Sequence, residues 1–169
     1  MQVNRRLLTA DAWLYRASNG RGLPQAATFR RVARMRRASL WLSFALSLVV
    51  LVGIVLQLYF IAAWIFGESG ALDAHKVVGG AVVHPAEVLI FLAALGAWWK
   101  TWRNVGWSFA LALLGTIQVF AVGDIANPKN GWAHGLHGGL VIFVFVLAAY
   151  IARRDAAALG LARPRGPAT

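Results

Sequence analysis

The residues best suited to chemistry in this sequence are its four histidines, and all four fall on two of its long apolar stretches. His75 and His84 belong to one stretch, and His134 and His137 open another. Ionisable side chains inside a membrane are costly, so they tend to face the protein interior and to serve a function. Neutral imidazole is a common ligand for iron, zinc and copper. The pattern therefore favours a bound cofactor or metal ion.

The spacing of the histidines limits which of them can share an ion. His75 and His84 are nine residues apart, which is about 13 Å along an ideal helix and on opposite faces, so they cannot both ligate one iron. His134 and His137 share a helix face, so one is expected to be a ligand and the other to orient or bond the cofactor. His75 is expected at a depth in the membrane similar to that of His134 and His137, so it pairs most naturally with one of those two. The alternative pair, His84 with His137, would lie deeper in the membrane.

Two imidazoles on opposed helices are ligands expected for haem b, whose flat faces pack against Leu, Val and Phe. The sequence has no Cys, which excludes covalent c-type haem attachment, iron–sulfur clusters and disulfides. Small residues beside the histidines would leave room for the macrocycle or simply allow close helix contact. These glycines are Gly79, Gly80, Gly135, Gly138 and Gly139.

Three further polar residues lie inside apolar stretches. Gln57 and Gln118 are placed to bond each other, a histidine ring nitrogen or a haem propionate. Glu87 lies one helical turn after His84. A carboxylate there should face the protein interior, as a proton site or as a partner of His84.

Acidic residues near the histidines suggest a second kind of site. Glu68, Asp73 and Asp124 could join His75 and His134 in a zinc or copper site. Of the two readings, a solvated loop is the favoured account of the three acidic residues.

The elements that must position these residues are long apolar helices. The chain has 169 residues, of which 59% are apolar and 14% are charged, and such a composition excludes an ordinary soluble enzyme. Because a hydrocarbon core about 30 Å thick requires roughly 20 apolar residues in a helix, the apolar stretches predict four membrane spans. They are residues 40–66, 77–99, 105–122 and 134–152. Short connections predict an all-α, antiparallel up-down four-helix transmembrane bundle.

The basic residues predict the orientation of the bundle. Fifteen of the 17 Lys and Arg residues fall before the first span, between the second and third, or after the fourth. The positive-inside rule then places both termini in the cytoplasm of a multi-pass protein of the cytoplasmic membrane. The net charge of +11 is accordingly a topology signal and not evidence for nucleic-acid binding.

The segments outside the bundle are short. Residues 1–39 form a basic segment, with a predicted amphipathic surface helix over residues 3–16 and an affinity for anionic lipids. Residues 153–169 are expected to form a disordered cytoplasmic tail. The connections between the spans are too short for a folded extramembrane domain, so function is expected within the 40–152 bundle, at its outer mouth or in a partner.

The histidine motifs resemble a family of small, uncharacterised four-span bacterial membrane proteins. The resemblance rests on residues 73–84, which read DAHKVVGGAVVH, on Gln118, and on residues 133–139, which read AHGLHGG. More coarsely, the arrangement is similar to four-helix b-type cytochromes and to one half of haem A synthase. That similarity implies haem ligation by His75 or His84 and by His134 or His137. The sequence lacks the outer-loop Cys pair and the second half of haem A synthase, so synthase activity is not implied.

These observations predict a b-type cytochrome-like haem protein that transfers electrons near the outer face, to a quinone or a redox partner protein. It would be a redox subunit without a catalytic site of its own. Two alternatives remain: a cofactor-free accessory or scaffolding subunit of a larger membrane complex, and a metal or proton transport element built on the histidines.

Overall fold

The computed structural model describes residues 23–122 and 131–161, and the chain divides into two units, residues 1–35 and 36–169. The predicted surface helix over residues 3–16 lies outside the described residues. Where the structure describes the backbone, all regular structure is helical and no strand occurs. The all-α prediction is therefore confirmed for the described residues.

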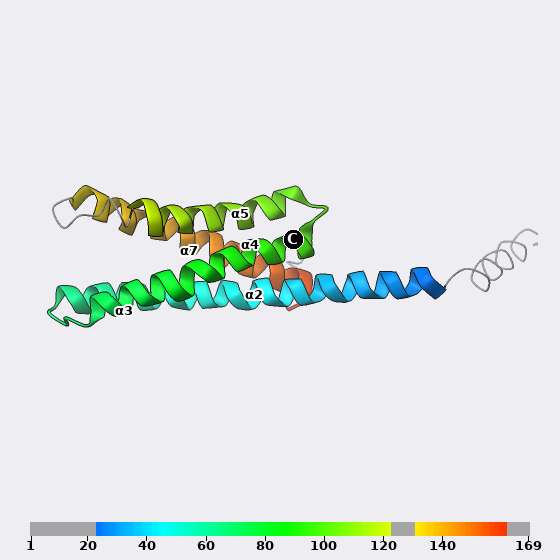
Figure 1. Cartoon of the computed structure of the whole chain (residues 1–169), viewed down its shortest axis with the longest axis horizontal. Helices are drawn as coiled ribbons and strands as arrows, with labels where there is room; N and C mark the ends of the chain where they lie inside the picture. The colour runs from blue at the N-terminus through cyan, green and yellow to red at the C-terminus, as the bar shows by residue number, and fades with distance from the viewer. Residues whose placement is uncertain (1–22, 123–130, 162–169) are drawn as a thin grey trace, which may run out of the picture. The chain divides into compact units, whose positions relative to one another are not determined.

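The described residues form a series of helical segments. In chain order they are α2 (Leu23–Ile65), α3 (Ala71–Val78), the π-helical η1 (Gly79–Val83), α4 (His84–Trp98), α5 (Trp102–Thr116), the π-helical η2 (Ile117–Val122) and α7 (Gly131–Leu159). The first predicted span corresponds to part of α2 and ends one residue beyond it, and the second corresponds to the end of α3 with η1 and α4 and ends one residue beyond α4. The third lies within α5 and η2, and the fourth within α7. In the second unit, α2, α4, α5 and α7 lie side by side (Figure 1).

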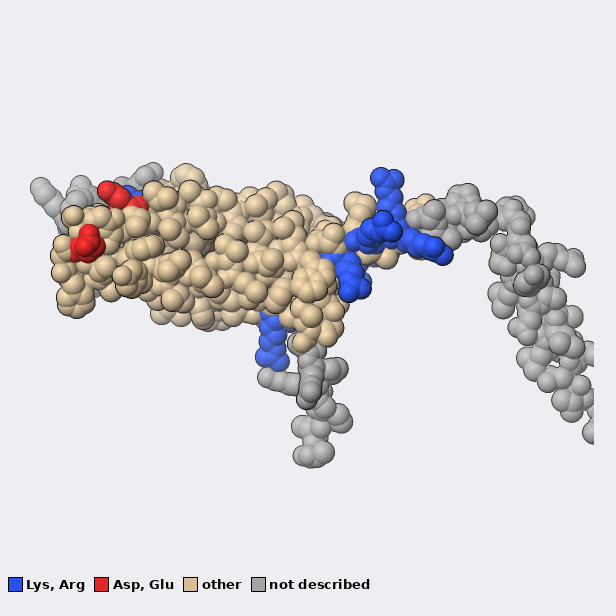
Figure 2. All heavy atoms as spheres, turned by 90° about the horizontal axis from the view of Figure 1, so that it is seen from below, with Lys and Arg blue, Asp and Glu red and all other residues tan. Residues whose placement is uncertain are grey.

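Three helical stretches are long and apolar enough to cross a membrane: Thr28–Ile65, Ala71–Trp98 and Gly131–Leu159. Large apolar side chains are exposed along them, such as Val52 and Leu58 on α2 and Phe143 and Val146 on α7. On the face shown in Figure 2, Lys and Arg gather over the described N-terminal part of α2, and a broad uncharged surface covers the stretch between the ends of the second unit.

Pro85 does not break the helix that contains it. A proline in a helix removes one N–H donor, and its ring crowds the carbonyl four residues earlier. The π-helical turn of η1 ends at Val83, so Pro85 occupies the first turn of α4, where a proline is tolerated. The widened turn of η1 rotates His84 relative to its place in an unbroken α-helix.

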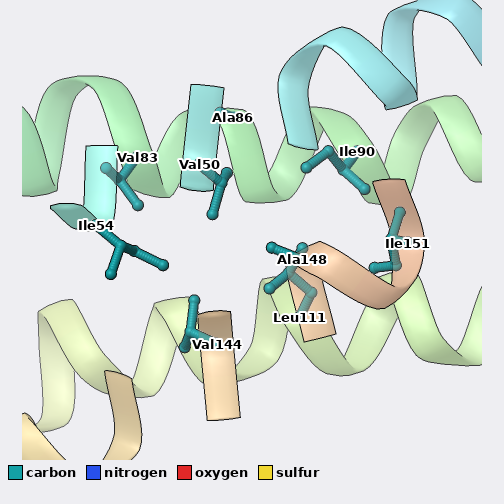
Figure 3. Packing of buried hydrophobic residues seen from close by; sticks show 9 residues of the cluster. All are labelled: Val50, Ile54, Val83, Ala86, Ile90, Leu111, Val144, Ala148 and Ile151. Carbon is teal, nitrogen blue, oxygen red and sulfur yellow. The ribbon is translucent and has the colours of Figure 1, made fainter. Parts of the chain in front are cut away.

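The interior of the second unit has an apolar middle layer to which every long helix contributes. Val50 and Ile54 come from α2, and the other members come from η1, α4, α5 and α7; these are Val83, Ala86, Ile90, Leu111, Val144, Ala148 and Ile151. Their side chains point toward one another (Figure 3). Because the middle layer is assembled from all four long helices, van der Waals contact within it favours their association as one unit.

A polar cluster closes the end of the unit that contains the α4–α5 turn. Asp155 on α7 is fully buried. Its Oδ2 accepts a hydrogen bond from Ser43 Oγ on α2 at 2.6 Å, and its Oδ1 accepts from Trp98 Nε1 on α4 at 3.1 Å and from Arg154 Nε at 2.8 Å. One carboxylate thus links three helices.

Arg154 extends this cluster to the fourth helix. Its guanidinium donates to the backbone oxygen of Asn104 on α5 at 2.7 Å and stacks over the Trp98 ring at 5.0 Å. Arg36 donates from Nε to the backbone oxygen of Ala97 at 3.1 Å and lies over the same ring. We call the group formed by Asp155, Ser43, Trp98, Arg154 and Arg36 the Asp155 cluster.

The prediction that a disordered tail begins at residue 153 is wrong. Residues 153–159, which the sequence had assigned to a disordered tail, continue α7 to Leu159. The physical reason is that Asp155 is held inside the protein by its three donors. The helix ends at Gly160, whose φ of +79° suits a glycine. The remaining predicted tail, residues 162–169, lies outside the described residues.

Candidate functional site

Two of the four histidines meet at the end of the second unit opposite the Asp155 cluster. The rings of His75 on α3 and His137 on α7 have centroids 6.1 Å apart and an interplanar angle of 63°. Both side chains are half-buried. Of the pairs that the spacing left open, the structure brings together His75 and His137.

The two glutamines hold the backbone around this pair. His75 Nδ1 lies 3.4 Å from the backbone oxygen of Gln57 on α2, to which an Nδ1–H can donate. Gln118 Nε2 on η2 donates to the backbone oxygen of His137 at 3.0 Å. The glutamines do not bond each other or a ring nitrogen through their side chains within the described residues. Their contacts join α2, α3, η2 and α7 around the His75–His137 pair.

Three buried polar atoms around the pair have no hydrogen-bond partner among the residues that the structure describes: Gln57 Oε1, Gln118 Oε1 and His137 Nδ1. A buried polar group without a partner costs free energy, so native proteins seldom leave one. The three atoms belong to residues joined by the contacts just described. Their concentration at one place marks it as a site for something that would complete their bonding.

The backbone near the pair is also irregular. The π-helical segments η1 and η2 lie on the two chain segments that carry Gly79 and Gln118, and π turns are frequent at functional sites. A side chain at Gly79 would collide with the Gln57 amide, so this glycine makes room for Gln57. By contrast, a Cβ added at Gly80, Gly135, Gly138 or Gly139 would meet nothing within 4 Å.

The other two histidines lie apart from the pair. His84 Nδ1 is 3.4 Å from Glu87 Oε2, and the ring packs edge-on against Phe120 at 5.5 Å. His134 is exposed. The deeper alternative of His84 with His137 is therefore not the pair that the structure forms, because η1 and the Glu87 contact direct His84 toward α5 and η2.

The acidic residues do not complete a metal site. Among the described residues, no three His, Asp or Glu side chains are grouped closely enough to hold a metal ion. Glu68 and Asp73 are exposed, and Asp73 pairs with Lys76 at 3.5 Å. Asp124 lies outside the described residues. Of the proposed set, Glu68 thus lies in the exposed turn before α3, and Asp73 is an exposed residue in the first turn of α3.

The ring-centroid distance of the His75–His137 pair is compatible with two imidazoles that would hold one haem iron. Two nitrogen–metal bonds of about 2 Å on opposite sides of an ion put the ring centroids roughly 6 Å apart. A hydrogen bond from His75 Nδ1 would leave Nε2 free as a ligand, as is usual for metal-binding histidines. A zinc site needs three or four protein ligands, whereas haem iron needs only axial ligands from the protein. Among the described residues no third His, Asp or Glu completes a metal site at this pair, and two imidazoles suit haem better than zinc.

One structurally important residue was not singled out from the sequence. Asp155 continues the buried positions Ala148, Ile151 and Ala152 at helical spacing, so periodicity could have placed it on the inner face of α7. Its position after two arginines instead suggested a solvated tail.

Comparison with protein families, with characterised proteins and with solved structures gave no match to this chain.

Proposed function

We propose that this protein is a b-type haem protein of the cytoplasmic membrane, with His75 and His137 as the axial ligands. The observation that carries the proposal is the approach of these two rings to 6.1 Å at a place where three buried polar atoms lack partners. Bound haem supplies a reversible one-electron couple at its iron. This is also the cofactor implied by the resemblance to four-helix b-type cytochromes.

In this proposal, the chain's own residues hold and orient the ligands. The backbone oxygen of Gln57 fixes the ring of His75, and Gln118 fixes the backbone of His137. The side-chain oxygens of both glutamines can accept hydrogen bonds, so each suits a protonated propionate or an ordered water. The apolar middle layer excludes water from one side of the site. A low dielectric and few charges favour the less charged form of an iron centre.

The proposed setting is a membrane. α2, the α3–η1–α4 stretch, the α5–η2 stretch and α7 would cross it as an antiparallel four-helix bundle, with both termini cytoplasmic by the distribution of Lys and Arg. The His75–His137 pair would then lie near the outer face, where a quinone or a redox protein could exchange electrons with it. Arginines at the start of α2 suit anionic lipid head groups; they are Arg30, Arg31, Arg34, Arg36 and Arg37.

The visible absorption spectrum tests the proposal. Protein expressed with ample haem and purified in detergent should be red, with a Soret band that shifts on reduction by dithionite. His137→Ala should abolish or change this spectrum, because one axial ligand is lost.

His134→Ala is the matched control, since it removes an exposed histidine from the same helix one turn away and should leave the spectrum unchanged. Colourless wild-type protein, or equal spectra for both variants, would contradict haem ligation by His137.

A further inference from the structure

Glu87 is a carboxyl group buried in the apolar middle layer of the protein. Its side chain is 2% exposed, and it lies on α4 between the core residues Ala86 and Ile90. The carboxyl group occupies the notch left by Gly115 on α5, where any Cβ would overlap it. The fit between these helices therefore depends on a carboxyl group being enclosed at this point.

His84 is the one described side chain that bonds this carboxyl group, through Nδ1 at 3.4 Å from Oε2. The helices packed around it offer no compensating cation. From residue 38 to residue 67, α2 and its following turn contain no Asp, Glu, His, Lys or Arg, and neither does the stretch from 104 to 123. Between residues 131 and 152, α7 contributes only His134 and His137. Tyr59 and Tyr150 pack against Phe60 and Trp107 instead.

An ionised carboxylate in such a place is strongly disfavoured unless it is paired. One bound proton removes the cost of an unpaired buried carboxylate, in either of two forms. The pair is then a neutral carboxylic acid beside a neutral imidazole, or a carboxylate beside an imidazolium. Both forms hold one proton and carry no net charge. Loss of that proton leaves one uncompensated negative charge in the apolar layer.

We propose that His84 and Glu87 together form a proton-binding site, and that the proton enters and leaves through the His84 ring. His84 is the more accessible partner, with a side chain 14% exposed against 2% for Glu87. On release, the proton of Glu87 Oε2 passes to His84 Nδ1, and the proton on Nε2 leaves the ring. Uptake follows the same steps in reverse. This site is separate from the His75–His137 pair and does not depend on bound haem.

Infrared spectroscopy of the full chain in detergent, with and without haem, can observe this proton directly. The chain has only two glutamates, Glu68 and Glu87, so ¹³C-glutamate labelling of Glu68→Gln protein reports on Glu87 alone. We expect an isotope-shifted carboxylic acid or carboxylate band that responds to external pH and to exchange into D₂O. The label should be lost in Glu68→Gln/Glu87→Gln protein.

His84→Phe tests the route, because it keeps a ring against Phe120 and removes the nitrogen that faces Glu87. We expect exchange of the Glu87 proton to slow at least tenfold in this variant. His134→Phe should leave the exchange rate unchanged. A Glu87 band that does not change with pH in wild-type protein would overturn the proposed proton-binding site. An unchanged rate of Glu87 proton exchange in His84→Phe would overturn the proposed route through the His84 ring. Neither outcome depends on a Soret band, so the haem proposal stands or falls separately.

Discussion

At the scale of single residues, Asp155 has the largest structural role in the described part of the chain. Its carboxylate accepts hydrogen bonds from Ser43, Trp98 and Arg154 while fully buried. Such a group is costly to bury, but once its partners are in place the loss of one member leaves the others unpaired. Asp155 therefore ties α2, α4 and α7 at one end, even though it plays no part in the histidine site.

Asp155→Ala is expected to destabilise the protein by about 3 kcal/mol, because three buried donors lose their acceptor. Thermal unfolding in detergent should show a clearly lower Tm. Asp73→Ala is the matched control, since Asp73 is exposed and its pair with Lys76 is a surface contact. An equal Tm for the two variants would mean that the Asp155 cluster does not hold the helices together.

At the scale of elements, glycines set how closely the helices approach. Gly53 on α2 allows contact with Val83 on η1, where a Cβ would lie 2.5 Å from a valine methyl group. Gly115 on α5 similarly accommodates the Glu87 carboxyl group of α4. Close packing of this kind is typical of membrane helices, whose association depends on van der Waals contact.

Gly115→Ala is expected to force α4 and α5 apart or to expel the Glu87 side chain, at a cost of about 1 to 3 kcal/mol. Gly106→Ala is the control on the same helix, because nothing lies within 4 Å of a Cβ there and alanine favours a helix over glycine. Thermal unfolding of the two variants measures the difference. A Tm as high for Gly115→Ala as for Gly106→Ala would show that the α4–α5 contact is looser than described.

At the scale of the whole molecule, the second unit has three layers along its helices. The His75–His137 pair lies at one end, the apolar core at the middle and the Asp155 cluster at the other end. Each long helix contributes to this order, as α7 does with His137, then Val144 and Ile151, then Asp155. A candidate site at one end and a structural cluster at the other are consistent with a bundle that faces different environments at its two ends.

The proposed topology can be tested by cysteine labelling, because the chain has no native Cys. Ser69→Cys, in the α2–α3 turn, should react with a membrane-impermeant maleimide in intact cells. Thr101→Cys, in the α4–α5 turn, should react only after the membrane is opened, since the positive-inside rule places that turn in the cytoplasm. The reverse pattern would place the histidine pair at the inner face.

The sequence alone determined the helical class, the apolar stretches and the candidate residues, because these follow from composition and from periodicity along a single helix. It also identified Gln57, Gln118 and Glu87 as interior polar groups, since an apolar stretch makes each of them conspicuous. The membrane topology and haem binding remain predictions of that pattern.

Only the tertiary structure decided which histidines meet. Spacing along the sequence left two possible partners for His75, namely His134 and His137, and one for His84, namely His137. The choice between these pairs depends on how η1 rotates α3 relative to α4 and on which side chain Glu87 faces. Likewise, the sequence predicted a disordered tail at Asp155, whereas in the structure its buried carboxylate accepts hydrogen bonds from Ser43, Trp98 and Arg154. Contacts between helices far apart in the sequence depend on packing in three dimensions, which the order of residues along one helix does not specify.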